Sequence, residues 1–294
     1  MKRAQVHPKP ANSAPLDTMS AVEIASLMNN EDAKVACAVR KALPQIARAI
    51  DLIAERLASG GRLIYVGAGT SGRIGALDAA ECPPTFNIDR SAVQYVIAGG
   101  SKALGTAVES KEDSRDLGRT DIADRKPAKK DVVIGLSASG RTPYTVAAVE
   151  HARKKGAMTL AVVCQTGSML AQAADTAIEI VVGPEVLAGS SRLKSASAQK
   201  MVCNMLTTGA MARLGHVYGD LMVNVQTKNA KLRERGIDIL MRAADVDRES
   251  ALTALDAAGM EVPVALVILK AGVNKTEAKR RLKLAGKSVR RALE

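Results

Sequence analysis

The chain has 294 residues, of which 47% are hydrophobic, and it carries a formal net charge of +12 at pH 7. This length can bury one α/β core with room for a small additional domain. No uninterrupted apolar segment reaches the roughly 18 residues of a spanning helix, and residues 1–15 lack the apolar stretch of a secretory signal, so we expect a soluble cytoplasmic protein.

Residues 1–50 are predicted to form a polar leader followed by helices. Ser20 and Glu23 have the spacing of a capping box, which predicts the start of a first helix. Pro44 suits the first turn of a second helix that runs to Leu57 and ends before Gly60 and Gly61.

Residues 51–218 alternate apolar strand-length runs with helical patterns. This alternation is the signature of a parallel sheet built from βαβ units, so the predicted fold class is a doubly wound α/β sandwich. A long amphipathic helix from about Lys194 to Leu214 closes the segment. The five predicted strands lie near residues 62–66, 93–98, 131–136, 158–164 and 176–182.

Residues 219–294 are predicted to form a separate helical module. Asn274 and Glu277 mark one helix start, with asparagine in place of the usual serine or threonine. The short helical patterns resemble a small three-helix module of the ubiquitin-associated type.

A glycine- and hydroxyl-rich turn, GAGTSG at residues 67–72, follows the first strand and opens a helix. Thr70, Ser71 and Gly72 would present hydroxyls and unpaired amides at the helix N-terminus, where an anion is favoured. The turn nearly matches the dinucleotide pattern G-x-G-x-x-G, but the acidic residue expected about 20 positions later would be Asp89, in a polar loop. A phosphomonoester site therefore fits better than a dinucleotide site, and a simple tight turn is the other alternative.

A second turn of the same character follows the strand near 131–136. Parallel strands open their loops at one edge of the sheet, so both turns would face the same ligand. Serine and threonine also cap helices, and at any single position the sequence does not separate the two uses. The phosphate candidates are Ser71, Ser137, Ser139 and Thr142, with Thr70, Gly72 and Arg141 in support.

The cysteines and histidines do not predict a metal site. The four cysteines include no C-x-x-C pair, and none of the three histidines lies near another in sequence. We expect no metal, no cofactor and no disulfide, with Cys82 as a packing residue.

The positive charge is concentrated in a basic stretch between Lys275 and Arg291. Such a stretch could contact nucleic acid, but no aromatic residue follows Tyr218 to stack on bases. A solvated helix face is the preferred interpretation, so no nucleic-acid partner is expected.

Several segments resemble the N-acetylmuramic acid 6-phosphate etherases. They are GAGTSGRIGALDAAECPPTF from Gly67, AVESKEDSRDLG from Ala107, GLSASGRTPY from Gly135 and GPEVLAGSSRLKSASAQKMVCNMLTTGAM from Gly183. The resemblance extends from about Leu27 to Arg235 and implies the sugar isomerase (SIS) fold, which binds phosphosugars. The glucokinase regulatory protein is similar in the same motifs.

The resemblance implies cleavage of the ether between D-lactate and carbon 3 of the sugar, by elimination and then water addition. Glu81 matches the family's proton donor and Glu112 its second acid–base residue. An apolar setting after a helix that stops at Glu81–Pro84 would raise the pKa of Glu81, and Lys111 and Arg115 would keep Glu112 ionised. Without the resemblance, Glu112 would be read as an ordinary surface glutamate.

Three further residues are possible sugar contacts: Glu109, Ser190 and Ser191. The resemblance also implies a homodimer. Two other functions stay open: a phosphosugar-binding regulator without catalysis, and an aldose–ketose isomerase of the same fold.

Overall fold

The computed structural model describes residues 14–225, 227 and 229–294, without the side chain of Glu109. Residues 1–13 of the predicted leader lie outside the described residues. The chain forms two compact units: one comprises Met1–Ala79 and Ser91–Leu206, and the other comprises Ala80–Arg90 and Thr207–Glu294. The three-part division at residues 50 and 218 stays a prediction.

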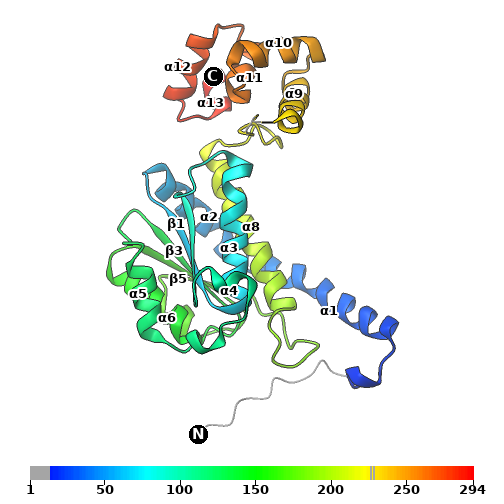
Figure 1. Ribbon diagram of the computed structural model, residues 1–294, viewed down its shortest axis with the longest axis vertical. Coiled ribbons are helices and arrows are strands. Elements are labelled where there is room, and N and C mark those ends of the chain that lie inside the picture. Colours follow the sequence, from blue (N-terminus) through cyan, green and yellow to red (C-terminus); the bar gives the residue numbers. More distant parts are fainter. Residues whose placement is uncertain (1–13, 226, 228) are drawn as a thin grey trace. The chain divides into compact units, whose positions relative to one another are not determined.

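The first unit contains a five-stranded parallel sheet (Figure 1). All five predicted strands are present, although the fifth ends at Glu179, three residues before its predicted end. The strand order is β2-β1-β3-β4-β5. The strands are β1 (Leu63–Gly67), β2 (Val93–Ile97), β3 (Val132–Ser137), β4 (Met158–Val163) and β5 (Thr176–Glu179).

Helices cover both faces of the sheet, which confirms the doubly wound α/β class. On one face, Ile64 and Val133 pack in a buried cluster with Tyr144 of α6 and Leu170 of α7. On the other face, Gly75 of α3 lies directly over Tyr65 and Leu136. The helices wholly within this unit are α1 (Ala21–Lys41), α2 (Leu43–Ala58), α4 (Lys102–Gly105), α5 (Arg115–Ala123), α6 (Pro143–Lys154) and α7 (Met169–Ala173), with 3-10 turns at Leu16–Thr18 and Glu109–Lys111. Two further helices, α3 (Gly69–Phe86) and α8 (Lys194–Leu214), belong to this unit as far as Ala79 and Leu206 and end in the second unit.

A buried polar contact ties α3 and α8 to the sheet. The Tyr65 hydroxyl donates to Asp78 Oδ2 (2.8 Å), and Asn204 Nδ2 donates to Asp78 Oδ1 (2.7 Å). A buried carboxylate is tolerated only when its oxygens accept hydrogen bonds, so this triad fixes both helices on β1.

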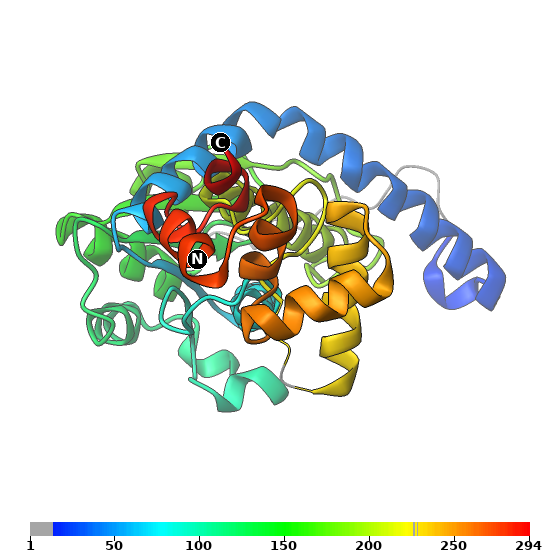
Figure 2. The ribbon, with the colours of Figure 1, turned by 90° about the horizontal axis from the view of Figure 1, so that it is seen from above.

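The first helix begins as predicted. Ser20 accepts from the Glu23 amide, and Glu23 accepts from the Ser20 amide, which completes the capping box. From there α1 extends away from the sheet layers (Figures 1 and 2).

The predicted end of α3 at Glu81–Pro84 is wrong, because the helix continues through Pro83 and Pro84 to Phe86. Each proline lacks the amide that would bond four residues back, and its ring crowds that carbonyl. Both prolines lie in the last turn of α3, where few backbone hydrogen bonds are affected. The Asn87 amide still donates to the Pro83 carbonyl (2.9 Å), and Asn87 itself is left-handed at φ 51°.

The strand order places a topological switch point between β1 and β3. The chain leaves β1 toward β2 on one side and later passes from β3 toward β4 on the other side. In open α/β sheets, the loops at the carboxyl ends of two such strands diverge and leave a crevice that binds ligands. The turns at residues 67–72 and 137–142 are those loops.

The second unit is helical and has its own apolar core. Ile237, Leu255, Leu266 and Val289 are fully buried in it. Asn274 caps α12 by accepting from the Glu277 amide (3.0 Å), as predicted. Five helices occupy residues 230–293, and the likeness to a three-helix ubiquitin-associated module stays a prediction. They are α9 (Ala230–Ala244), α10 (Arg248–Ala258), α11 (Val262–Ala271), α12 (Lys275–Leu284) and α13 (Val289–Leu293).

Within the described residues, no single helix has the length and apolar character needed to cross a membrane. The pair α10 and α11 meets those two criteria only when the helices are taken together, and they are bent by 118° at the break between them.

The packing of α5 on α6 predicts the effect of one substitution. A Cβ on Gly118 would lie 2.1 Å from the Tyr144 carbonyl oxygen, which is backbone and cannot move aside. We expect Gly118→Ala to lower the free energy of unfolding by roughly 2 kcal/mol, measured by urea denaturation. Gly105→Ala is the control, because nothing lies within 4 Å of that Cβ position. Equal stabilities of the two variants would contradict this packing.

Candidate functional site

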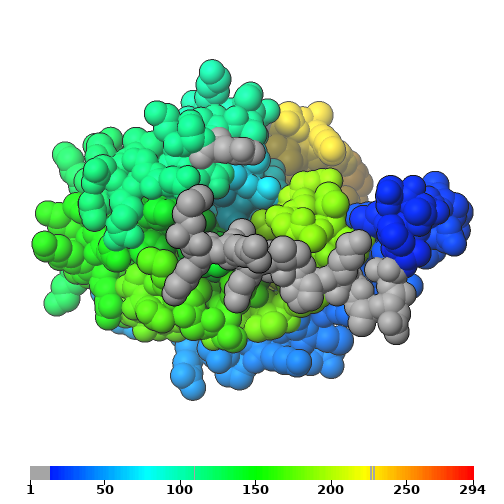
Figure 3. Space-filling view, turned by 90° about the horizontal axis from the view of Figure 1, so that it is seen from below, coloured from blue at the N-terminus to red at the C-terminus, as the bar shows by residue number. Residues whose placement is uncertain are grey.

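A cavity of about 290 Å³ lies in the first unit at the carboxyl edge of the sheet. The loops that follow β3, β4 and β5 contribute to its wall, together with Glu112. In the view of Figure 3, the segments around residues 100–120 and around residue 190 both reach the surface. The polar side chains that line the cavity belong to Glu112, Ser137, Ser139, Thr142, Gln165, Glu185, Ser191 and Ser195.

Glu112 lies against the glycine turn that follows β1. A Cβ on Gly69 would be only 2.8 Å from Glu112 Oε1, so the carboxylate occupies the space that a side chain at position 69 would fill. The Glu112 carbonyl accepts from the Tyr144 amide (3.0 Å), which fixes its backbone to the first turn of α6. The residue is half-buried. The structure thus brings Glu112 from a charged loop to the switch point of the sheet.

The turn after β3 is held by its own hydroxyls. Ser137 Oγ accepts from the Gly140 amide (3.0 Å) and shares a hydrogen bond with Thr142 Oγ1 (2.9 Å). Ser139 Oγ accepts from the Arg141 amide (3.2 Å). Thr142 stands at the N-cap of α6, but its side chain makes no capping hydrogen bond. The N-terminus of α6 therefore opens toward the cavity without a side-chain cap.

The N-terminus of α8 is capped by an acidic side chain. Glu185 accepts from the Lys194 amide (3.0 Å), the Ser195 amide (2.9 Å) and the Ser195 hydroxyl (2.8 Å). A carboxylate at a helix N-terminus is stabilised by the helix dipole and by amides that lack intrahelical partners. Glu185 therefore already occupies these donors of α8.

A buried ion pair connects the start of α8 to α1. Lys194 Nζ donates to Glu31 Oε2 (2.6 Å), and the Lys194 residue is only 1% exposed. The hydrogen bond from Lys194, followed by that from Lys34, lowers the pKa of Glu31. The Lys194 ammonium group is therefore committed to Glu31.

The remaining predicted phosphate ligands lie outside the cavity lining. Ser71 Oγ donates to Gln199 Oε1 (2.8 Å), which anchors the first turn of α3 to α8. Gly72 packs closely against Ile97, because a Cβ there would lie 2.6 Å from that side chain. Among the sequence-predicted site residues, the lining contains Glu112, Ser137, Ser139, Thr142 and Ser191, and it does not contain Thr70, Ser71, Gly72, Arg141 or Ser190.

Two sequence-predicted residues cannot be placed in this cavity. The side chain of Glu109 lies outside the described residues, although its backbone starts the 3-10 turn before Glu112. Glu81 belongs to the second unit, on the last turns of α3. The apolar surroundings predicted for Glu81 are wrong, because the residue is exposed and the helix continues past it.

The cavity contains one thiol, from Cys164. Burial raises the pKa of Cys164 to about 12, so the thiol is protonated at neutral pH and is not a nucleophile. Cys82 is buried, in agreement with its expected packing role. Within the described part of the chain, no group of three or more histidine, cysteine, aspartate or glutamate side chains could hold a metal ion.

Sequence reasoning missed Glu185, Ser195 and Gln199. Glu185 follows β5 by six residues, and the sequence had extended that strand to residue 182. Its position after a predicted strand was the available signal, since loops that follow parallel strands lie at the carboxyl edge of the sheet.

Comparison with known proteins agrees with the fold and the site motifs. The family model described as glucokinase regulatory protein N-terminal SIS domain matches residues 45–153, and the SIS domain model matches residues 127–209. An N-acetylmuramic acid 6-phosphate etherase of Klebsiella aerogenes is 49% identical over 96% of this chain and 94% of its own length. One of Symbiobacterium thermophilum is 55% identical over 89% of this chain and 87% of its own.

The chain belongs to the N-acetylmuramic acid 6-phosphate etherase family. Etherases of this family are carbon–oxygen lyases by the reaction that they catalyse. Among solved structures, a phosphoheptose isomerase of Neisseria gonorrhoeae has a TM-score of 0.52 at 17% identity, over 66% of this chain and all of the other. That likeness shows the SIS fold of this etherase family member.

The buried pair between α1 and α8 yields a stability prediction. Glu31→Gln would leave the Lys194 ammonium buried without its charge partner, so we expect the free energy of unfolding to fall by about 3 kcal/mol or more. Adding Lys194→Met to Glu31→Gln should recover most of that loss, because no charge is then buried. Urea denaturation of both variants measures the effect. A double variant as unstable as Glu31→Gln would contradict a charge-based cause.

Proposed function

We propose that this protein removes D-lactate from N-acetylmuramic acid 6-phosphate and leaves N-acetylglucosamine 6-phosphate. Family membership at about half identity over nearly the whole chain supports this activity. The proposal rests on the position of one carboxylate in the first unit. The Glu112 carboxylate meets Gly69 at the switch point and lines the same cavity as the hydroxyls of Ser137, Ser139 and Thr142.

The phosphate of the sugar is proposed to bind at the turn after β3. Its oxygens would accept from the three hydroxyls, close to the N-terminus of α6, where the helix dipole favours negative charge. A fixed phosphate places the sugar ring toward Glu112 across the cavity. Thr70, Ser71, Gly72 and Arg141 are kept as proposed supporting ligands on the strength of the family motif alone.

The chemistry proceeds by elimination because an ether oxygen is a poor leaving group for direct displacement. In the open-chain sugar, a base removes the proton on carbon 2, which is acidic because it lies next to the aldehyde. The electron pair of the broken C–H bond forms the second bond between carbons 2 and 3, the bond from carbon 3 to the ether oxygen breaks, and an acid protonates that oxygen. Water then adds at carbon 3, and carbon 2 regains a proton.

Glu112 is proposed as the base and Glu81 as the acid. Each positioned proton transfer contributes on the order of 10² to 10⁴ in rate. The role of Glu81 rests on the family motif AAECPPT, because Glu81 and Glu112 belong to different units of the structure. Sugar contacts from Glu109, Ser190 and Ser191 are part of the same proposal.

The cellular setting is also proposed. A homodimer in the cytoplasm that recycles peptidoglycan sugars is consistent with a wall-derived phosphosugar as the substrate. No cofactor is required, because the elimination and hydration steps need only proton transfers and water.

Release of D-lactate from N-acetylmuramic acid 6-phosphate tests the activity. We expect the wild type to release lactate and Glu112→Gln to lose at least about 100-fold in rate, because a glutamine does not accept the carbon 2 proton. Asp113→Asn is the matched control, since it removes a neighbouring exposed carboxylate. If the wild type binds the phosphosugar without lactate release, the protein is a regulator; interconversion of aldose and ketose phosphates would indicate an isomerase.

Gly69 offers a second, independent test of the site. Gly69→Ala would introduce a Cβ that collides with Glu112 Oε1 in a left-handed backbone at φ 52°. We expect its lactate release to fall at least tenfold below that of Gly60→Ala, where the backbone is also left-handed (φ 75°) but nothing lies within 4 Å. Both variants carry the same kind of backbone strain, so only displacement of Glu112 separates them. Equal activities would contradict the placement of the carboxylate.

A further inference from the structure

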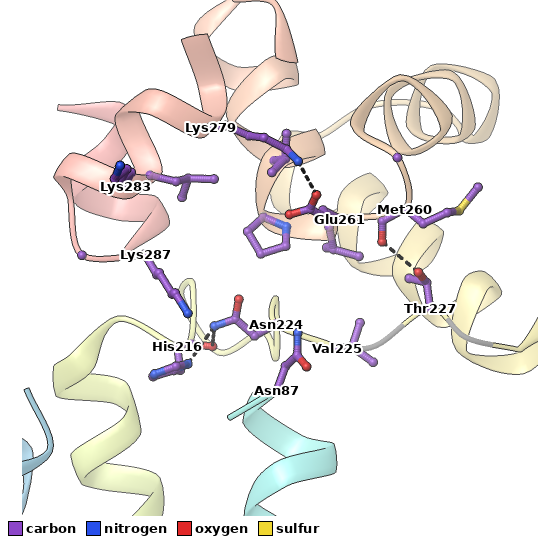
Figure 4. A pocket seen from close by; sticks show the side chains of 16 residues that line it. Asn87, His216, Asn224, Val225, Thr227, Met260, Glu261, Lys279, Lys283 and Lys287 are labelled. Carbon is purple, nitrogen blue, oxygen red and sulfur yellow. Dashed lines mark hydrogen bonds and ion pairs between the residues drawn. The ribbon is translucent and has the colours of Figure 1, made fainter. Parts of the chain in front are cut away.

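A larger cavity, of about 820 Å³, lies entirely within the second unit (Figure 4). Pockets that bind small molecules measure about 300 to 1,000 Å³ and combine an apolar lining with a few polar groups. None of the motifs that support the etherase activity contributes to this cavity. Its wall comes from the residue after α3, the segment between α8 and α9, the turn between α10 and α11, and the end of α12.

The charged groups of this lining are mostly cationic. Lys279, Lys283 and Lys287 are spaced four residues apart and all line the cavity. Glu261 is the single acidic residue among the described lining residues, and it forms an ion pair with Lys279 (2.6 Å). Lys283 and Lys287 are therefore left as the positive charges available to a ligand.

Lys287 extends toward a polar corner formed by His216 and Asn224 (Figure 4). His216 Nδ1 lies 3.1 Å from the Phe86 carbonyl oxygen and 3.0 Å from Asn224 Nδ2. Burial, with a further contribution from Lys287, lowers the pKa of His216. The corner thus brings the Lys287 ammonium group and the Asn224 amide next to the His216 imidazole.

The cavity also has an apolar wall. It is formed mainly by the turn before α11 and the first turn of α11, and its side chains pack on the buried core of the second unit. A ligand that reached from one wall to the other would place a charged end near Lys287 and an uncharged body on this surface. The apolar lining residues are Val225, Met260, Val262, Pro263, Val264 and Leu282.

Strained backbone is concentrated around this cavity. The described chain has five non-glycine residues with positive φ, and three of them line the cavity: Asn87 (51°), Met260 (67°) and Lys287 (68°). The left-handed conformation is costly for residues with a Cβ and recurs at ligand sites, where surrounding structure enforces it. At position 287 glycine would suit the backbone better than lysine, so the lysine side chain is retained at an energetic cost.

We propose that this cavity binds a small organic anion, with its carboxylate or phosphate head at Lys287 and Lys283 and an apolar body on the wall at the start of α11. The site is separate from the proposed etherase site in the residues that form it, so its existence does not depend on that function. The lysine charges favour an anionic head group. The apolar wall adds affinity only for a ligand that also has an apolar body, so a small inorganic anion would bind more weakly.

The test is a titration of the full-length protein, followed by the ring signals of isotopically labelled histidine. The chain has three histidines, so the His216 signals are assigned by their loss in His216→Gln. The probes are octanoate and octyl phosphate, which carry both parts of the ligand; acetate and inorganic phosphate, which carry the head alone; and octanamide, which carries the body without charge.

We expect a saturable shift of the His216 signals with octanoate or octyl phosphate below their micelle concentrations. An anion beside the ring would also raise the pKa of His216. Acetate, inorganic phosphate and octanamide should bind at least about tenfold more weakly, as expected for loss of either the charged contact or the apolar contact. The absence of any saturable shift would overturn the proposal, and so would an affinity for octanamide equal to that for octanoate.

Lys287→Gly removes the charge without destabilising the fold, since glycine lacks the ammonium group and readily adopts the left-handed backbone. We expect it to weaken octanoate binding about tenfold or more. Lys126→Gly is the matched control, because Lys126 is also left-handed (φ 49°) but lies in the first unit. Lys283→Gln tests the second cation in the same way. Unchanged affinity in Lys287→Gly and Lys283→Gln would overturn the assignment of the head group.

Discussion

The close approach of Glu112 to the glycine turn after β1 is the constraint on which the site depends. Gly69 has no side chain, and the Glu112 carboxylate occupies the space that one would fill. The strand order, with its reversal between β1 and β3, makes this approach possible, because the loops after these strands diverge and leave an opening. Anchoring of the Glu112 backbone to the first turn of α6 then places this carboxylate and the hydroxyl-rich turn after β3 on one cavity.

Two helix N-termini face this part of the fold, and they are used differently. Glu185 accepts from the first amides of α8, whereas Thr142, the N-cap residue of α6, makes no side-chain capping hydrogen bond. Since an N-terminus already occupied by a carboxylate does not attract a second anion, this difference favours the turn before α6 as the proposed phosphate site. The buried pair of Lys194 and Glu31 then holds the start of α8 against α1. The cavity is thus supported by a polar framework, of which Glu185 and Ser195 also belong to the cavity lining.

Much of the fold was predictable because its signals are local. Apolar runs of strand length, the capping box at Ser20 and the cap at Asn274 each depend on neighbours in sequence, and all are present. Local signals failed where tertiary structure decides. Pro83 and Pro84 predicted a helix end, yet α3 continues past them and leaves Glu81 exposed. Glu185 and Gln199 were missed because their partners lie 9 to 128 residues away in sequence. Glu112 was found by its motif, and its position beside Gly69 is information that only the fold supplies.

The most direct test of the account is exchange of the carbon 2 proton of N-acetylmuramic acid 6-phosphate in deuterated water, followed by NMR. If Glu112 is the base and Glu81 the acid, the Glu81→Gln variant still exchanges that proton while the ether stays intact, whereas Glu112→Gln loses exchange and cleavage together. Exchange at the wild-type rate in Glu112→Gln would contradict the account, since the proton would then be removed by a group other than the carboxylate held over Gly69.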